Sequence, residues 1–424
     1  PLSESGATLL HNPPPTGGHN PRDEVPSTLT PDRACPNIHK KRGITMTELE
    51  NAEKLFQAYQ VKEAYPLFQK LAEEGNGRAL YFLALYEQYY LGAAPFSPEG
   101  AIEKALKGVR AGDGLCGVYC MLHFDLLSHE AFHEIMDAKE KWIDAAKKES
   151  DVFALEALGC LSVVHGKTDE EVHTGLHLLE AAALQGYWKA WNDLGQFHDR
   201  HVKDNNPLLK KYVDDKKSLS SYRKSMEAGY PDSMNRLAYF YYLGDGVAKD
   251  EKEGIRLFKK AFSKGHLKAG TALGMLYLFD ENGGSKKEGF RYTKKAAEGG
   301  EPTAMGNLAN CYDYGNGTKK DRRLAKEWYQ KASDAGMDSS TTQLAVMYHE
   351  DGNDGKAFAL FQKAADRGFP EAMGWLAACY QYGYGTEPNS LAAVQWLEKA
   401  AALGSSEAKE ALQYLHQELK GNEL

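Results

Sequence analysis

The sequence predicts an all-α protein whose helices form pairs that stack into a solenoid. A glycine-marked pattern recurs at steps of 36, 35, 36, 32 and 36 residues between Gly229 and Gly404. Small or apolar residues stand four, eight, nine and twelve positions after these glycines, which places them on one face of an α-helix. The hydrophobic fraction of 42% is slightly low for a compact globule, as expected where each repeat is covered only by its neighbours.

Residues 1–45 differ in composition from the rest of the chain. They hold eight of the 16 prolines and show no apolar period of 2 or 3.6 residues. Such a segment buries too little apolar surface to offset the entropy cost of ordering it, so we expect a disordered Pro-rich extension. A Pro-rich docking tail is the alternative, although no clean Pro-x-x-Pro pattern is present. Met46 opens the first amphipathic helix pattern and is a candidate translational start.

Residues 46–228 predict a divergent set of helix-pair repeats. Their markers are weaker copies of the later pattern, at Gly75, Gly112, Ser150 and Gly186. The step from Gly186 to Gly229 is 43 residues, and the extra length lies in the polar stretch 203–217. Over the whole chain we expect about nine full units, a partial opening unit and a C-terminal capping helix within residues 405–424.

Residues 229–404 predict well-formed repeats, each with a first and a second helix. Prolines two residues after a marker suit the first helical turn, where a missing N–H costs little, at Pro231, Pro302 and Pro370. A Gly-x-Gly segment such as Gly244-Asp245-Gly246 allows positive φ and ends the first helix. The second helix ends at the next marker glycine. A single hairpin of this kind leaves its apolar faces uncovered, so its neighbours must stack on it.

The repeat consensus A-x-x-x-L-G-x-x-Y…G-x-G…D…A-x-x-W-Y-x-K-A-A-x-x-G resembles that of the Sel-one-like repeat family, a relative of the tetratricopeptide repeat. The match is specific over residues 229–404, where five consecutive units fit, and it is weaker over residues 46–228. The resemblance implies a right-handed α/α superhelix that acts as an adaptor or scaffold for other proteins. It implies a binding protein rather than an enzyme, with no cofactor.

In helix-pair superhelices of this kind, the first helices line a concave groove. Polar and tyrosine side chains that the packing pattern leaves unused are candidates for partner binding: Asn192, Gln196, Asn235, Tyr239, Tyr242, Asn310, Asp313, Tyr314, Gln381 and Tyr382. Asn and Gln hydrogen-bond an extended backbone, and Tyr offers a stiff contact surface with a polar tip. A packing role between repeats is an equal alternative for several of the tyrosines. The partner is expected to be a peptide or a protein, and its identity and the oligomeric state stay open.

The segment His129-Glu130-Ala131-Phe132-His133 is the one motif that suggests an enzyme. Two histidines four residues apart share a helix face, and a glutamate between them could activate a zinc-bound water, which makes a zinc-dependent hydrolase the alternative function. Ser128 is predicted to be an N-cap, which places the motif in the first turn of a second helix. No third ligand follows in register, so polar surface histidines are the preferred interpretation and no metal is expected.

A second histidine pair, His173 and His177, lies on the second helix of the next repeat. Measured from the closing markers, the two pairs are offset by about eight residues, or about 12 Å along a helix. One ion cannot join groups so far apart, so the pairs do not predict a shared metal site.

Composition argues against several other functions. The formal net charge of −8 is spread without long runs of one sign, which disfavours nucleic acids and anionic membranes as partners. No run of 18 apolar residues and no signal-peptide pattern occurs. The glycine loops lack the Lys-Ser/Thr of a phosphate-binding loop, and no nucleophile elbow is present.

The six cysteines show no Cys-x-x-Cys spacing and lie mostly in apolar contexts, which predicts free, packed thiols. Free thiols favour a reducing compartment, and the cytoplasm is therefore the expected location. A secreted effector that binds host proteins is the alternative, because address signals can lie outside a given chain.

Overall fold

The computed structural model describes residues 46–89, 91, 97–201, 206–279 and 285–421. Residues 1–45, the predicted disordered extension, lie outside these described residues. Within the described ranges every regular element is a helix and none is a strand, which confirms the predicted fold class.

The helices fall into two halves that differ in how they pack. The N-terminal half contains α1 (Met46–Gln57), α2 (Val61–Glu73), α3 (Gly77–Gln88), α4 (Pro98–Arg110), α5 (Gly114–Leu122), η1 (Phe124–Leu126), α6 (His129–Asp137), α7 (Lys139–Glu149), α8 (Val152–His165), α9 (Asp169–Leu184), α10 (Trp188–His198), η2 (Pro207–Tyr212) and α11 (Asp215–Glu227). The C-terminal half contains α12 (Pro231–Leu243), α13 (Glu251–Ser263), α14 (Leu267–Leu278), α15 (Lys286–Glu298), α16 (Pro302–Tyr314), α17 (Arg322–Asp334), α18 (Asp338–Glu350), α19 (Asp354–Asp366), α20 (Pro370–Tyr382), α21 (Ser390–Ala402) and α22 (Ser406–Gly421).

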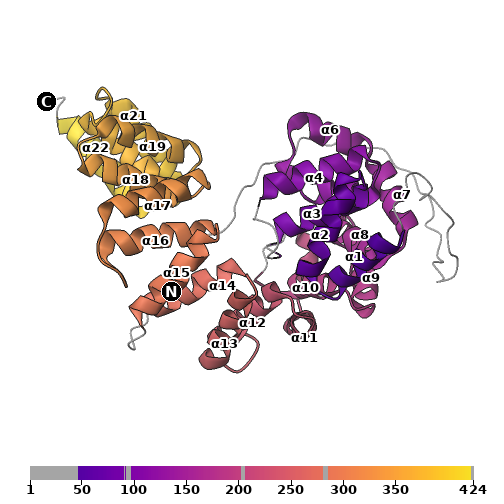
Figure 1. Ribbon diagram of the computed structural model, residues 1–424. Coiled ribbons are helices and arrows are strands. Elements are labelled where there is room, and N and C mark those ends of the chain that lie inside the picture. Colours follow the sequence, from indigo (N-terminus) through magenta and orange to yellow (C-terminus); the bar gives the residue numbers. More distant parts are fainter. Residues whose placement is uncertain (1–45, 90, 92–96, 202–205, 280–284, 422–424) are drawn as a thin grey trace. The chain divides into compact units, whose positions relative to one another are not determined.

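The helices of each repeat form an antiparallel pair, and each pair stacks on the next. The strongest packing joins α12 with α13, α14 with α15, and so on to α20 with α21, and each second helix then contacts the first helix that follows it. Figure 1 shows α12 to α22 stacked in chain order. The α/α solenoid predicted from the glycine period is therefore the observed architecture.

The marker glycines end the second helices, as the sequence predicts. All nine, from Gly75 to Gly404, have φ between 87° and 108°, a left-handed conformation that L side chains rarely adopt. Ser150 fills the same position in one repeat and has a φ of 51°. The prolines that follow Gly229, Gly300 and Gly368 stand at the start of α12, α16 and α20, where their missing N–H leaves no bond unmade.

The N-terminal half shares one continuous core, which a simple stack does not predict. The ring of Phe56 in α1 packs against Phe82, Phe153 and Trp188, and the Trp188 indole N–H donates to the Phe56 carbonyl at 2.9 Å. Phe56 and Trp188 are 132 residues apart. The first helix of the chain therefore contacts the fourth repeat after it, because large aromatic side chains fill the space between them.

The C-terminal half has four smaller cores along its length instead of one. Each gathers side chains from neighbouring helices, such as Leu237 with Phe258 or Leu376 with Leu397. This arrangement matches the expectation that each repeat is covered only by its neighbours.

One expected element is in a different place. The His129–His133 segment was expected in the first turn of a second helix, but it opens α6, a separate nine-residue helix inserted between α5 and α7. Ser128 does cap it, because its hydroxyl accepts from the Ala131 N–H at 3.2 Å. The second helix of this repeat is α7, which pairs with α5. The chain breaks at Ala138, which carries no glycine or proline signal.

Candidate functional site

One register of positions forms a continuous face on the first helices. We call it the inner face, and it comprises residues 3, 6, 7, 10, 13 and 14 positions after the marker that precedes each first helix. These positions alternate with the packing positions four, eight, nine and twelve residues after the marker. Successive first helices contact one another, as α8 with α10, α14 with α16 and α18 with α20, more than successive second helices do. The inner face therefore lies on the side where stacked helices converge.

In the N-terminal half the inner face is closed and forms part of the core. Phe82 of α3 and Phe153 of α8 hold inner positions, are buried, and meet edge to face at 4.9 Å between centroids. The Lys189 ammonium of α10 lies 5.0 Å from the centroid of the Tyr89 ring, three repeats away. The described part of this half therefore leaves no open groove along its first helices.

A cluster of buried ionisable groups occupies this closed face. The Lys189 ammonium lies 2.5 Å from a Glu156 carboxylate oxygen and 3.0 Å from one of Asp193, and all three residues are buried. The Cys160 thiol donates to Glu156 at 3.2 Å. Two carboxylates and one ammonium leave the ionised cluster one negative charge in excess, which a buried site disfavours.

The protonation states follow from this surplus. Burial raises the pKa of Asp193 to about 7 against the opposing pull of Lys189, and the Glu156 carboxylate adds to the rise. Lys189 keeps its proton, because Asp193 and Glu156 raise its pKa well above the ordinary value despite burial. Burial likewise raises the pKa of the Cys160 thiol.

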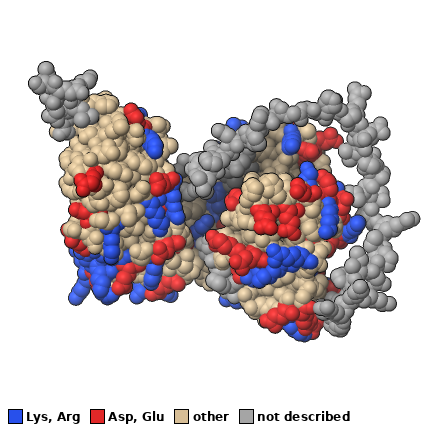
Figure 2. Space-filling model, turned by 90° about the horizontal axis from the view of Figure 1, so that it is seen from above, with Lys and Arg blue, Asp and Glu red and all other residues tan. Residues whose placement is uncertain are grey.

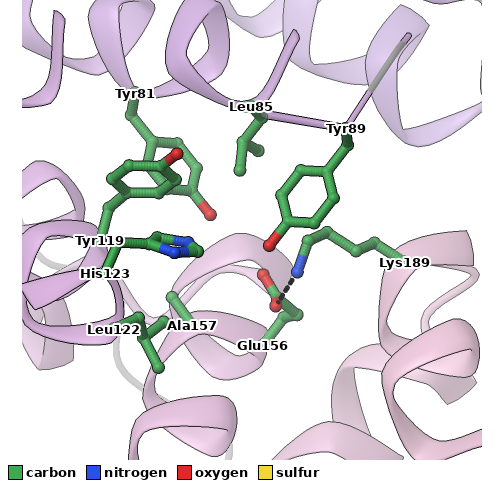
Figure 3. A pocket seen from close by; sticks show the side chains of 9 residues that line it. All are labelled: Tyr81, Leu85, Tyr89, Tyr119, Leu122, His123, Glu156, Ala157 and Lys189. Carbon is green, nitrogen blue, oxygen red and sulfur yellow. Dashed lines mark hydrogen bonds and ion pairs between the residues drawn. The ribbon is translucent and has the colours of Figure 1, made fainter. Parts of the chain in front are cut away.

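This cluster borders a small cavity but lacks the features of an active site. Figure 3 shows Tyr81, Tyr89 and Tyr119 around the cavity, with the ion pair of Lys189 and Glu156 at its wall. The space open to the centre of a water molecule is about 10 Å³, which holds about one water and no organic substrate.

Glu156, Cys160 and Asp193 form the one group of three possible metal ligands among the described residues. Their ligand atoms lie within 4.8 Å of one another. The Lys189 ammonium already contacts both carboxylates, and the thiol keeps its proton because burial raises its pKa. The donor set therefore suits an ion pair better than a thiolate-bound metal.

A second buried ion cluster links the same half. Arg78, at an inner position of α3, contacts Glu149 at 2.8 Å, Glu53 at 3.1 Å, and Asp151. Burial raises the pKa of Glu53 to about 7 against the opposing pull of Arg78. These bonds join α1, α3, α7 and the start of α8, so they hold the closed face together.

In the C-terminal half the same register is open. Five apolar or aromatic side chains at inner positions are largely exposed: Leu243 (60%), Phe279 (70%), Tyr314 (58%), Tyr382 (58%) and Tyr414 (64%). They stand 14 residues after their markers, or 10 in the case of Tyr414. From α12 onward, six of the eight exposed large hydrophobic side chains in the described residues lie on this face, the sixth being Tyr239. Exposed apolar groups that recur on one face mark an interaction surface.

The structure places the candidate amides mostly in internal contacts. Asn192 and Asn235 are buried, and the Asn192 side-chain oxygen accepts from the Ser233 hydroxyl at 2.8 Å. The Asn310 side-chain oxygen accepts from the Tyr329 hydroxyl. Gln196 and Gln381 are half-buried. These amides hold inner positions, and the bonds of Asn192 and Asn310 join neighbouring helices.

The candidate tyrosines and Asp313 are more accessible. Tyr314 and Tyr382 are exposed, whereas Tyr242 and Asp313 are half-buried. Tyr239 is 40% exposed and also packs edge to face on Phe258 at 4.8 Å, so it has a packing role as well.

Sequence reasoning missed Leu243, Phe279 and Tyr414, which the structure adds to the face. Leu243 and Phe279 could have been predicted from the repeat register, because they stand 14 residues after their markers, as Tyr314 and Tyr382 do.

The two histidine pairs are separate surface features. The Nε2 atoms of His129 and His133 lie 3.3 Å apart on exposed positions of α6. The rings of His173 and His177 are 4.3 Å apart on α9, and His177 contacts Glu180. Among the described residues, no His, Cys, Asp or Glu lies within ligand distance of both histidines of either pair. Within the described residues each pair offers two ligands, whereas catalytic zinc sites use three protein ligands.

The fold and this face define a helix-pair repeat protein with one open surface on its first helices. The Sel1 repeat profile matches residues 231–266, 271–301, 302–337, 340–369 and 370–405. The chain is thus a Sel1-repeat protein, as the consensus predicts.

Known proteins are similar to this chain over about half of it or more, one in structure and two in sequence. A protective antigen of uropathogenic Escherichia coli with an SLR fold is 24% identical, covers 86% of this chain and 78% of its own, and has a TM-score of 0.51. Chitin synthase regulator SKT5 of Saccharomyces cerevisiae is 28% identical over 229 residues, which are 49% of this chain and 32% of that protein. An exopolysaccharide production negative regulator of Rhizobium leguminosarum bv. viciae is 24% identical over 50% of this chain and 86% of its own.

The chain thus spans about a third of the yeast relative and most of the rhizobial one. Among the described residues, no helix combines the length and apolarity needed to cross a bilayer.

Proposed function

We propose that this chain is a non-catalytic scaffold that binds a partner protein on the inner face of α12–α22. The observation that carries the proposal is the repeated exposure of Leu243, Phe279, Tyr314 and Tyr382 at one register. Contact of such groups with water is unfavourable. A partner that covers them stabilises the complex by about 25 cal/mol for each Å² of apolar surface that it buries. Two of the relatives are named as regulators, which supports action through another protein.

The proposed scaffold acts in a reducing compartment. Cys116, Cys120, Cys160, Cys311 and Cys379 are free and buried, and burial raises the pKa of each thiol. Buried free thiols suit the cytoplasm, which we propose as the location.

Affinity purification of the full chain, followed by mass spectrometry, tests the proposal. Tyr314→Ala combined with Tyr382→Ala is expected to weaken recovery of the specific partner at least about tenfold, because aromatic contacts often contribute about 2 kcal/mol each. Leu391→Ala with Leu403→Ala is the matched control, since both leucines are also largely exposed but lie on α21 and the residue after it, away from the inner face. Partner recovery that survives the tyrosine changes, or falls equally in the control, contradicts the assignment.

A further inference from the structure

The described inner positions of α16, α18, α20 and α22 carry acidic groups, no Lys or Arg, and one histidine, His349, which contacts Asp354 of α19 at 2.6 Å. The acidic groups include Asp313, Glu350, Glu371, Glu407 and Glu410. Glu350 pairs with Arg322 of α17 at 2.8 Å. The other four form no ion pair within the described residues. The face therefore presents four uncompensated carboxylates.

The acidity of the face exceeds that of the surrounding sequence. Residues 302–421, which span α16–α22, contain 15 Asp and Glu against 12 Lys and Arg, so this stretch is only weakly acidic. Most exposed basic side chains from α13 to α17 stand on second helices, where Lys252 of α13 and Lys287 and Lys295 of α15 form no ion pair among the described residues, whereas Lys268 is exposed on the first helix α14. Figure 2 shows Lys and Arg on the lower side of the left-hand part, with Asp and Glu among them. The second helices thus carry charges of both signs, whereas the described inner positions of α16–α22 carry carboxylates without Lys or Arg.

Two of the inner carboxylates lie close enough to affect each other. Burial raises the pKa of Glu371, and the charge of Glu407 raises it further. The Gln343 amide donates to Glu371 at 3.4 Å, a long and neutral contact that leaves the charge in place. A cation between Glu371 and Glu407 would relieve this repulsion.

Aromatic rings stand beside these carboxylates. Tyr314, Tyr382 and Tyr414 are exposed at inner positions, and Trp375 is half-buried at another. The rings of Tyr382 and Tyr384 are 5.7 Å apart, so both border the end of α20. A Lys or Arg side chain gains about 0.5–2 kcal/mol over a tyrosine face, and its stem packs on the ring.

We propose that the inner face of α16–α22 binds a Lys- or Arg-rich extended segment of a partner protein. The inference rests on the proposed function and specifies the chemistry of its partner. Cationic side chains pair with Asp313, Glu371, Glu407 and Glu410, and the exposed tyrosines cover their stems. Stacked helices lie about 8–10 Å apart, so four first helices span about 30 Å, which an extended segment covers with about nine residues. Phosphate-bearing partners are repelled by the same carboxylates.

A random twelve-residue peptide library displayed on phage, selected on the purified full chain, tests this chemistry. We expect the enriched peptides to carry a net positive charge and to bind less tightly as salt rises. Glu371→Gln combined with Glu407→Gln is expected to weaken binding of an enriched synthetic peptide about threefold to tenfold, since two solvent-exposed charge contacts are lost. Glu327→Gln, on the opposite face of the stack in α17, is the matched control and is expected to bind like the wild type.

Each outcome separates this inference from the proposed function. Enriched peptides that are neutral or acidic, or that bind the Glu371→Gln/Glu407→Gln variant at wild-type strength, overturn the cationic inference. If the Tyr314→Ala/Tyr382→Ala variant no longer binds those same peptides, the proposed function stands and only the cationic inference is overturned. Failure to enrich any peptide that depends on the inner face overturns both. Circular dichroism spectra matching the wild type confirm that each variant is folded.

Discussion

Asp193 shows how much the closed half depends on single residues. Its carboxylate accepts hydrogen bonds from the Lys189 ammonium and the Cys160 thiol, and Glu156 lies beside it. The Tyr89 ring lies against the Lys189 ammonium. The sequence placed these residues at inner positions but did not reveal their burial. From the sequence alone, a lysine or aspartate at such a position is predicted to be a solvent-exposed residue of the groove. Only the curvature of the stack shows that it is buried. The exposed tyrosines Tyr314 and Tyr382 were predictable because their side chains have no packing position in the repeat pattern.

The pH dependence of stability tests the state of Asp193. Burial raises its pKa to about 7 in the folded chain, whereas an unfolded Asp has a pKa of about 3.9. Between these values the folded state holds a proton that the unfolded state lacks. The free energy of unfolding therefore falls as the pH rises, by up to about 1.4 kcal/mol per pH unit, and levels off above the folded pKa.

Urea unfolding of wild type and Asp193→Asn at pH 5 to 8 measures this effect. The amide stays neutral, so we expect the variant to gain stability relative to the wild type as the pH rises through this range. Asp366→Asn, at an exposed position, is the control and is expected to follow the wild-type profile. Comparison with the wild type removes the contribution of Glu53, whose pKa burial also raises to about 7. Parallel profiles for wild type and Asp193→Asn would show that the aspartate is ionised throughout.

At the scale of elements, the sequence predicted the helix boundaries best where backbone geometry requires a special residue. Marker glycines, helix-opening prolines and Gly-x-Gly turns all stand where the structure needs left-handed φ or a missing N–H. Residue 138 has no such signal, and the break between α6 and α7 was therefore missed. The inserted helix α6 buries one side chain, Ile135.

Ser150 offers a test of the marker rule. It adopts a φ of 51° where the other repeats have glycine, and a left-handed conformation costs a side-chain residue about 1–2 kcal/mol. Its hydroxyl donates to the Lys147 carbonyl at 3.0 Å on the exposed surface, a bond of small net value. We expect Ser150→Gly to raise the free energy of unfolding by about 1 kcal/mol, measured by urea denaturation.

Gly186→Ala is the matched reverse change. Gly186 has a φ of 89° and an added Cβ would meet no atom within 4 Å, so the expected loss of about 1 kcal/mol is a backbone effect alone. Destabilisation by Ser150→Gly would mean that its side chain contributes more than its conformation costs.

At the scale of the whole chain, the repeat pattern predicted the stack but not the difference between its halves. The same inner register is a buried core from α3 to α10, whereas from α12 to α22 it exposes large side chains such as Tyr314 and Tyr382 beside buried ones such as Asn235. The inner face closes in the N-terminal half because four repeats curve together and because large side chains such as Phe82, Phe153 and Trp188 fill the space between their helices. A periodic consensus describes one repeat and its neighbour, so it carries no information on contacts between distant repeats.

The two halves therefore have different roles in this account. The closed half is a rigid support, joined by its aromatic core and its two buried ion clusters. The open half presents the apolar and acidic inner face that we propose as the binding surface. Function in such proteins lies in the side chains displayed on the repeats, and the repeat fold itself does not specify it.

Hydrogen–deuterium exchange of the full chain, with and without a peptide recovered from the display selection, tests the central claim most directly. The account predicts that bound peptide slows exchange in the first helices α16, α18 and α20 and at their C-terminal turns, and leaves α3, α5, α8 and α10 unchanged. Protection confined to the second helices α13, α15 and α17, or to the N-terminal half, would contradict the claim that the open inner face is the binding surface.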